Sequence, residues 1–226
     1  MVLAERAERT SSNHAGTLPR LVAETLAEGG RLGPNDALAV TIGPGSFTGL
    51  RIALSFAKGL AFAGGYRVVG VPTLDALAIV APPVSGRLCA ALDARKREVY
   101  AALYERDGDR LMRCGEPCAI SADRLAAAVG VTCTFIGDAV ESYGQVFQQV
   151  LGPGARLLPS SAHPPSAVAV ARLAATRLGS AAEGDALADL APSYVRPPEA
   201  ELTQSKYSPS GAYAALDFVD KVPIVY

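Results

Sequence analysis

The chain has 226 residues, half of them hydrophobic, which is enough for one sizeable core or two small lobes. Its 21 Lys and Arg nearly balance its 22 Asp and Glu, for a formal net charge of -1, so it lacks the basic footprint of a strong independent nucleic-acid binder. Its four cysteines form no CxxC pair, and no apolar run reaches the roughly 18 to 20 residues that cross a bilayer. With no signal-peptide core at the N-terminus either, we expect reduced thiols and a cytoplasmic protein that binds no membrane.

The first part of the chain alternates strand and helix patterns. Thr17 can cap a helix that has Pro19 in its first turn and ends near Gly29. The other elements expected here are a strand at Val2–Thr10, a strand at Ala37–Ile42, a helix at Phe47–Ala63 and a strand at Arg67–Val71. The last three form a predicted βαβ unit.

A second α/β pattern follows. Its expected elements are two strands within 87–105 joined by a turn at Ala94–Arg97, a strand after Asp107–Asp109, a helix capped by Ser121, a strand at Thr132–Ile136 and a helix at Ser166–Leu178. The sequence thus predicts an α/β fold with a first lobe at 1–86, a second lobe at 87–200, and an extended or poorly ordered tail at 201–226.

A glycine-rich loop follows the strand at Ala37–Ile42. Its candidate anion- or nucleotide-contacting residues are Gly43, Pro44, Gly45, Ser46 and Thr48. Ser46 can accept a hydrogen bond from the first turn of the next helix, whose free amides and dipole favour an anion. The spacing fits neither a P-loop nor a dinucleotide-binding fingerprint. The alternative is a tight strand-to-helix turn without a ligand.

The helix at Phe47–Ala63 carries two apolar stripes. At about 100° per residue, one consists of Phe47, Leu50, Leu54, Ala57 and Ala61. The other consists of Ile52, Phe56 and Leu60, and a polar strip of Thr48, Arg51, Ser55 and Lys58 separates the two. A surface helix on a sheet needs one apolar face, so the second stripe predicts contact with another helix or another subunit. We favour a subunit interface.

A charged cluster surrounds the predicted hairpin turn of the second lobe. It comprises Asp93, Arg95, Glu98 and Tyr100. In one interpretation, these residues contact a cleft between the lobes or a partner protein. In the other, they form a solvated hairpin end with a local ion pair. An exposed ion pair contributes only about 0 to 1 kcal/mol, so stability alone is a poor reason for its presence. The sequence leaves the two interpretations open.

Four segments together resemble the TsaB family of tRNA threonylcarbamoyladenosine biosynthesis proteins, also called YeaZ-like. They are VTIGPGSFTGLRIALSFAKGLA (40–61), VVGVPTLDALA (68–78), ALDARKREVYAALYE (91–105) and APSYVRPPEA (191–200). The resemblance implies a two-lobed fold of the actin, sugar-kinase and Hsp70 type (ASKHA, RNase H-like). Family members open with a strand reading like AIDTS, whereas this chain begins one strand later, so we expect an incomplete first lobe.

The resemblance also implies a role without catalytic residues. The family pairs with the catalytic homologue TsaD and the ATPase TsaE to modify the adenosine after the anticodon of tRNAs that read ANN codons, and it also pairs with itself. The helices after His14 and Gly45 resemble its pairing helices, so the candidate interface residues are His14, Leu18, Ile52, Phe56 and Leu60. ATP with Mg²⁺, and a metal, are expected on the partner subunits, with tRNA bound through the complex.

Two enzymatic alternatives accompany this interpretation. The first is a glycoprotease-like peptidase, suggested by an older grouping of the family and by His14. The catalytic homologue binds its metal through two histidines one helical turn apart, but here Leu18 stands four residues after His14, and one ligand makes no site. The second is an autonomous ATPase of the actin-like superfamily, suggested by Gly43–Ser46. The sequence itself predicts no intrinsic metal site and no intrinsic cofactor.

Overall fold

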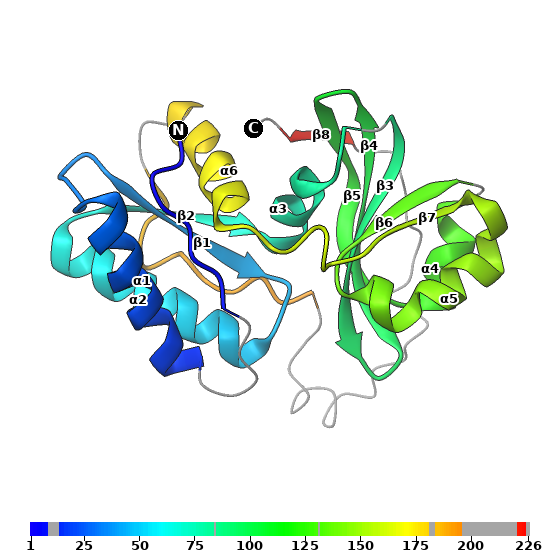
Figure 1. Cartoon of the computed structure of the whole chain (residues 1–226), viewed down its shortest axis with the longest axis horizontal. Coiled ribbons are helices and arrows are strands. Elements are labelled where there is room, and N and C mark those ends of the chain that lie inside the picture. The colour runs from blue at the N-terminus through cyan, green and yellow to red at the C-terminus, as the bar shows by residue number, and fades with distance from the viewer. Residues whose placement is uncertain (9–13, 84, 131, 181–183, 196–220, 225–226) are drawn as a thin grey trace. The chain divides into compact units, whose positions relative to one another are not determined.

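The computed structural model describes residues 1–8, 14–83, 85–130, 132–180, 184–195 and 221–224, which fall into two compact α/β units (Figure 1). The first unit comprises Met1–Thr73 and Ser166–Ser193, and the second comprises Leu74–Pro165 with a strand near the C-terminus. These units differ from the predicted lobes at 1–86 and 87–200. The helix after Pro72 buries its leucines in the second core, and a later helix returns to the first unit.

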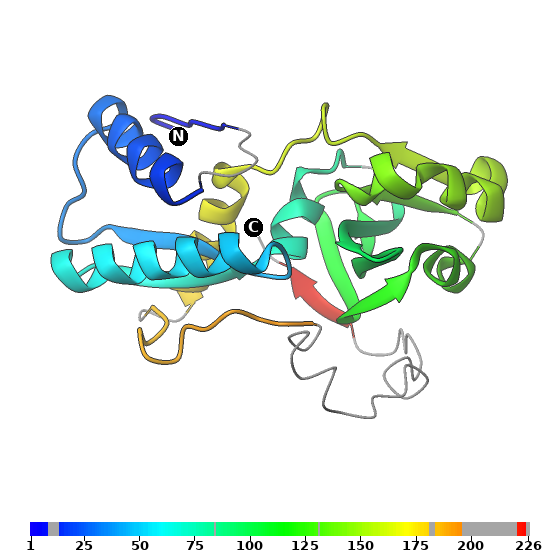
Figure 2. The same ribbon diagram turned by 90° about the horizontal axis from the view of Figure 1, so that it is seen from below.

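The first unit contains a short parallel sheet between helices (Figures 1 and 2). Its described elements are α1 (His14–Gly29), β1 (Ala37–Gly43), α2 (Phe47–Gly64), β2 (Arg67–Pro72) and α6 (Ala167–Ser180). Side chains of α2 pack against Val40 and Val68. Because successive strand residues point to opposite faces, Val69 and Val71 face the other side, which α6 covers. The predicted βαβ unit is confirmed.

Asp185 and Arg177 form hydrogen bonds with the backbone groups of β2 on the edge that faces away from β1. The Gly70 N–H donates to Asp185 Oδ2 at 2.6 Å, and Asp185 N–H donates to the Val68 carbonyl at 2.8 Å. Arg177 donates to the Gly70 carbonyl and, at 2.9 Å, to Asp185 Oδ1. Backbone groups buried without partners are costly, so this clamp takes the place of a neighbouring strand.

Replacing Gly70 is expected to destabilise the first unit. A Cβ at Gly70 would lie 2.6 Å from Ile42 Cγ2 and 2.7 Å from Leu190 Cδ1. Gly70→Ala should therefore lower the free energy of unfolding by about 1–3 kcal/mol, the usual cost of overpacking, in a urea titration. The matched control is Gly59→Ala in α2, where a Cβ meets nothing within 4 Å. That control should gain up to about 1 kcal/mol, and equal effects at the two positions would contradict the packing described for Gly70.

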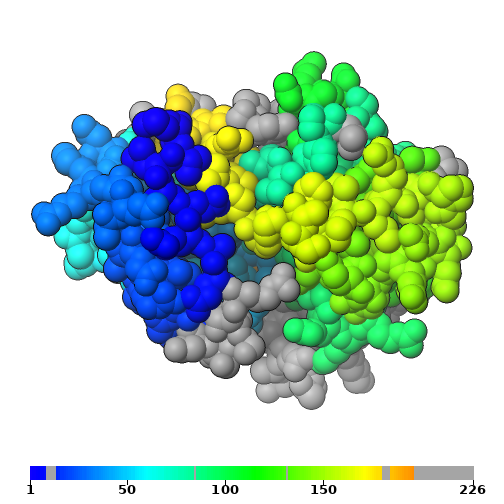
Figure 3. Space-filling view, viewed as in Figure 1, coloured from blue at the N-terminus to red at the C-terminus, as the bar shows by residue number. Residues whose placement is uncertain are grey.

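The N-terminal segment and α1 depart from the sequence-based expectations. Residues 1–8 form no regular strand. Instead Arg6 pairs with Glu28 of α1 at 2.7 Å and Glu5 accepts a hydrogen bond from Ser166 Oγ at 3.0 Å, so the segment lies along α1 in Figure 3. This segment lacks the apolar face that a buried strand requires. The helix also begins at His14, so the predicted cap Thr17 lies buried inside it.

The second unit is built on a mixed six-stranded sheet of order β7-β6-β3-β4-β5-β8. Its described elements are α3 (Thr73–Val80, from Leu74 onward), β3 (Gly86–Arg95), β4 (Glu98–Asp107), β5 (Arg110–Ser121), α4 (Ala122–Val129), β6 (Cys133–Ile136), α5 (Ala139–Leu151), a 3-10 turn (Gly152–Gly154), β7 (Ala155–Leu158) and β8 (Lys221–Ile224). The predicted hairpin, third strand, helix after Ser121 and β6 strand are confirmed, but the Ser121 side chain makes no capping hydrogen bond to α4. α3, α5 and β7 were not predicted.

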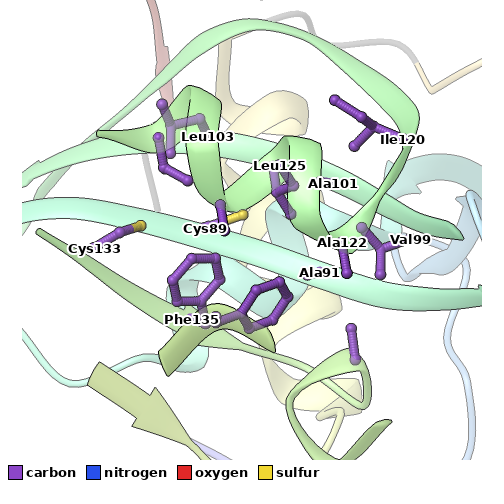
Figure 4. Packing of buried hydrophobic residues seen from close by; sticks show 14 of the residues in the cluster. Cys89, Ala91, Val99, Ala101, Leu103, Ile120, Ala122, Leu125, Cys133 and Phe135 are labelled. Carbon is purple, nitrogen blue, oxygen red and sulfur yellow. The ribbon is translucent and has the colours of Figure 1, made fainter. Parts of the chain in front are cut away.

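The two faces of this sheet have separate cores. α4 and α5 cover one face, where the Phe135 ring stacks on Phe147 with centroids 4.2 Å apart, close to Cys89 (Figure 4). α3 covers the opposite face, where Leu74 and Leu77 pack against Leu88, Ala90 and Tyr104. Odd-numbered residues of β3 and β4 serve the first core and even-numbered ones the second, as strand alternation requires.

Part of the predicted tail is a strand. β8 pairs antiparallel with β5, with Leu111 opposite Ile224 and Met112 opposite Pro223, at the outer edge of the second sheet. Pro cannot donate to a ladder but is tolerated on an edge strand. Residues 221–224 of the predicted extended or poorly ordered tail thus form an extended edge strand. Residues 201–220 lie outside the described part of the chain.

Candidate functional site

The loop between β1 and α2 is a tight turn in which Ser46 caps the helix. The Gly49 N–H donates to Ser46 Oγ at 3.3 Å, which confirms the predicted cap, and the Leu50 N–H donates to the Ser46 carbonyl at 2.8 Å. Gly43 has φ +112°, and a Cβ there would lie 2.8 Å from the Ser193 carbonyl oxygen. Only glycine fits this approach. The geometry fully explains the glycine at this position, and anion binding by the loop stays a prediction.

Within this loop the side chains divide by exposure. Gly43 and Pro44, joined by a cis peptide bond, are buried, whereas Ser46 and Thr48 are exposed beside the half-buried Gly45. A ligand approaching the loop would therefore meet the Ser46 and Thr48 side of the turn.

The outer face of α2 carries exposed aromatic side chains. Leu50, Leu54, Ala57 and Ala61 are buried as predicted. Phe47, predicted to join them, is instead 45% exposed, with the Arg51 guanidinium 4.0 Å from its ring centroid. This cation–π contact and the position of Phe47 at the helix start keep the ring outside the core. Phe62, near the other end of α2, is 85% exposed.

The second predicted stripe is partly buried, on a helix that has another helix beside it. Ile52, Phe56 and Leu60 are each half-buried, and α1 packs beside α2 within the same unit. An internal helix, the alternative to a subunit, therefore lies beside α2. His14 and Leu18 on α1 are half-buried too. The structure thus places the predicted interface residues on two adjacent helices, and partner contact there stays a prediction.

The β3–β4 hairpin is held near its turn by hydrogen bonds to α5 and to Asp138 just before it. Asp93 Oδ1 accepts from the Arg95 N–H at 2.8 Å and from the Tyr143 hydroxyl at 3.3 Å, and Asp93 Oδ2 accepts from Ser142 Oγ at 3.3 Å. The Asp93 N–H donates to Asp138 Oδ1 at 2.8 Å. Burial raises the pKa of Asp138, which lies just before α5. Asp93 is therefore a structural anchor, and its ion pair with Arg95 is loose, with 3.9 Å between charged atoms.

The other members of this cluster lie at the start of β4. Glu98 pairs across the hairpin with Arg95, and Tyr100 pairs with Leu92. Both side chains are half-buried, whereas Arg95 is 87% exposed. The structure therefore brings the four predicted residues together on one hairpin, and their contact with a cleft or partner stays a prediction.

The tip of the hairpin has an unusual backbone. Arg95, Lys96 and Arg97 have φ values of 64°, 53° and 67°, all in the left-handed region. Each such residue that is not glycine costs about 1–2 kcal/mol. A two-residue hairpin turn of this kind normally contains Asn and Gly. Neither residue is present at 95–97, so no local pattern predicts this conformation.

Relieving this strain is expected to stabilise the protein. Lys96→Asn with Arg97→Gly supplies the residues that suit a left-handed two-residue turn, so the free energy of unfolding should rise by about 1–3 kcal/mol in urea. The opposite change is Gly108→Lys in the β4–β5 turn, where φ is +57°. It should cost about 1–2 kcal/mol. A loss of stability in the Asn-Gly variant would contradict the described turn.

A buried polar network joins α3 to the second sheet. The Tyr104 hydroxyl donates to Asp75 Oδ1 at 2.8 Å, and Arg113 Nη1 lies 3.2 Å from Asp75 Oδ2. Burial raises the pKa of Asp75, which the charge of Arg113 and the hydrogen bond from Tyr104 partly oppose. Burial also raises the pKa of Tyr104. No sequence pattern pointed to this network, whose members are far apart in the chain.

The remaining candidate groups are the potential metal ligands and the cysteine thiols of the described residues. Within the described ranges, no group of three or more His, Cys, Asp or Glu could hold a metal ion. Burial raises the pKa of Cys118 to about 11 and that of Cys133 to about 12, so these thiols are poor nucleophiles at neutral pH. Among the same described residues, no helix is long and apolar enough to span a membrane.

Comparison with known proteins places these features in a family. The family model described as "TsaD: tRNA N6-adenosine threonylcarbamoyltransferase" matches residues 6–204. A solved structure of YeaZ from Pseudomonas aeruginosa is 30% identical, with a TM-score of 0.70, over 83% of this chain and 86% of that one. The chain belongs to this family, as a TsaB/YeaZ-like member. The predicted α/β fold of the actin-like type is confirmed.

Curated relatives in the family carry the TsaB name. "tRNA threonylcarbamoyladenosine biosynthesis protein TsaB" of Escherichia coli is 49% identical over 74 residues, which are 32% of this chain and 32% of that protein. The chain thus matches about a third of that relative's length. The TsaB protein of Bacillus subtilis is 27% identical over 205 residues, covering 88% of this chain and 87% of that protein.

Proposed function

We propose that this chain is a non-catalytic scaffold subunit in the formation of threonylcarbamoyladenosine in tRNA. It would pair with a TsaD-like catalytic subunit, act with a TsaE-like ATPase, and reach tRNA through the complex. Membership of the TsaB/YeaZ group supports the pathway, since TsaB relatives are named for this biosynthesis. The catalytic subunit and its metal, and ATP with Mg²⁺ on the partners, would supply the chemistry.

The observation that carries the pairing role is the outer surface of α1 and α2, which we call the α1–α2 face. It comprises the half-buried residues His14, Leu18, Ile52, Phe56 and Leu60, and we include the exposed Phe62, which lies on α2 in line with the neighbouring polar strip of Arg51, Ser55 and Lys58. A large aromatic side chain that is 85% exposed on a regular helix gains most when a partner buries it. Aromatic residues at the centre of such surfaces commonly dominate binding. The same face would serve self-pairing when the catalytic subunit is absent.

An omission assay tests this function. The chain, a TsaD-like subunit and a TsaE-like ATPase from one organism are mixed with unmodified tRNA, ATP, Mg²⁺ and an activated threonylcarbamoyl donor. The amount of threonylcarbamoyladenosine formed in the tRNA is then measured. We expect product only when all three proteins are present. The same amount of product without this chain would sink the proposal. Peptide cleavage abolished by His14→Ala would instead favour the peptidase alternative, and ATP binding by the isolated chain in calorimetry would favour the autonomous ATPase.

A further inference from the structure

The hairpin tip carries a local cluster of positive charge, although the chain as a whole has no excess of positive charge. Arg95, Lys96 and Arg97 are consecutive and exposed, whereas the chain's formal net charge is -1. Phosphate binding by a protein of balanced charge has to come from such a local cluster, because long-range attraction is weak.

The conformation of the tip is unfavourable for the residues that form it. All three have positive φ, although Asn and Gly would make the same turn with less strain. Strained backbone of this kind is typical of positions that serve binding. All three side chains are positively charged, whereas an Asn-Gly turn would carry no charge.

The tip is also anchored to α5 through Asp93, whose ion pair with the Arg95 side chain is loose at 3.9 Å. Asp93 accepts hydrogen bonds from Ser142 and Tyr143 of α5, and Asp138 accepts from the Asp93 N–H. Glu141 of α5 accepts from the Ser160 N–H and Oγ, both at 2.7 Å. Glu98, which pairs with Arg95 directly beside the tip, is half-buried. A rigid loop with outward cations binds an anion at a lower entropic cost than a mobile loop does.

We propose that the Arg95–Lys96–Arg97 tip contacts the phosphate backbone of RNA. The proposal rests on the proposed function, because it names the part of this chain that touches the tRNA substrate. RNA is favoured over an acidic protein surface for two reasons. Three adjacent cations suit a polymer with regularly repeated charges, and two of the three are arginines, whose guanidinium forks match phosphate bidentately.

The test measures tRNA affinity of the reconstituted three-protein complex as a function of salt. The variant is Lys96→Asn with Arg97→Gly, which removes two charges while suiting the turn. The control is Arg31→Ser with Arg172→Ser, which removes two exposed cations from the first unit. Fluorescence anisotropy of a labelled tRNA transcript gives Kd between 50 and 300 mM salt. Circular dichroism and urea unfolding establish that both variants fold.

The Asn-Gly variant should bind tRNA about 14- to 30-fold more weakly at about 0.15 M salt, and its slope of log K against log salt should be shallower by about 1.4–1.8, as expected for two lost phosphate contacts. The control should match the wild type. An unchanged slope and Kd in the Asn-Gly variant would overturn the proposal. So would weaker binding to the TsaD-like subunit in RNA-free buffer, which would assign the tip to a protein contact.

The omission assay tests the proposed function separately, because it measures nucleoside formation and not tRNA affinity. If this chain proves dispensable for product but still adds tip-dependent, salt-sensitive tRNA affinity, the RNA contact stands and the scaffold role falls. If the chain stimulates product but the Asn-Gly variant keeps wild-type tRNA affinity, the RNA contact falls and the scaffold role stands.

Discussion

Phe62→Asp is expected to weaken pairing with the TsaD-like subunit by about 30- to 900-fold, while the chain itself stays as stable as the wild type. Phe62 is 85% exposed, so a carboxylate there costs the isolated chain little. In a complex the same carboxylate would be buried without a partner. Losing a large aromatic contact that dominates an interface typically costs about 2–4 kcal/mol, which gives the stated range of Kd. Isothermal titration calorimetry measures the affinity and urea unfolding the stability.

Two further variants sharpen this result. Val150→Asp on α5 makes the same kind of change at an apolar residue that is 47% exposed in the second unit, and it should leave pairing unchanged. Phe56→Asp should weaken pairing as well, but it should also lower stability because Phe56 is half-buried. Wild-type affinity in Phe62→Asp and Phe56→Asp would remove the α1–α2 face from the proposal.

Arg113→Met is expected to lower the free energy of unfolding by about 3–5 kcal/mol at pH 7. Only 14% of the Arg113 side chain and 10% of the Asp75 side chain are exposed, and the pair is 3.2 Å apart. Removing one partner leaves a buried carboxylate with the Tyr104 hydroxyl but no counter-charge, which is the costly case for a buried ion pair. Because α3 is attached to the sheet through Asp75, its local unfolding should also become easier.

The loss should depend on pH in a defined direction. The folded pKa of Asp75 is already raised above its ordinary value of 3.8 by burial, and removing Arg113 raises it further. A raised folded pKa gives stability that is fully present below the unfolded pKa and is lost as pH rises through the folded pKa. The deficit of Arg113→Met relative to wild type should therefore shrink from pH 7 towards pH 4. Arg110→Met, on the exposed start of β5, should change stability by no more than about 0.5 kcal/mol. A deficit of equal size at both pH values would contradict the proposed role of the Asp75 charge.

Elements with a clear local period were predictable from sequence. The strands at Ala37–Gly43 and Arg67–Pro72 and the helix between them each carry an uninterrupted pattern, and the cap at Ser46 follows from residue type. α5 was missed although Ala139, Val140 and Phe147 mark a buried face. α3 is only eight residues long and largely buried all round, so its apolar run has no period that separates helix from strand.

Other features depend on contacts that no local pattern encodes. Asp185 reaches Gly70 across 115 positions of sequence, and Tyr104 reaches Asp75 across 29. The left-handed tip at Arg95–Arg97 lacks the Asn or Gly that would have signalled it. Phe47 was assigned to the core by angle alone, but its place at the helix start and its contact with Arg51 keep it at the surface. The candidate site was therefore predictable in location and only partly in geometry.

The most direct test of the scaffold role is a titration of this chain into a fixed amount of the TsaD-like subunit, with TsaE-like ATPase, unmodified tRNA, ATP with Mg²⁺ and an activated threonylcarbamoyl donor in excess. The initial rate of threonylcarbamoyladenosine formation should rise with added chain and reach a plateau near one chain per catalytic subunit. Phe62→Asp should shift that curve to higher concentration without changing the plateau. A rate that is the same at every concentration of the wild-type chain, including none, would contradict the account.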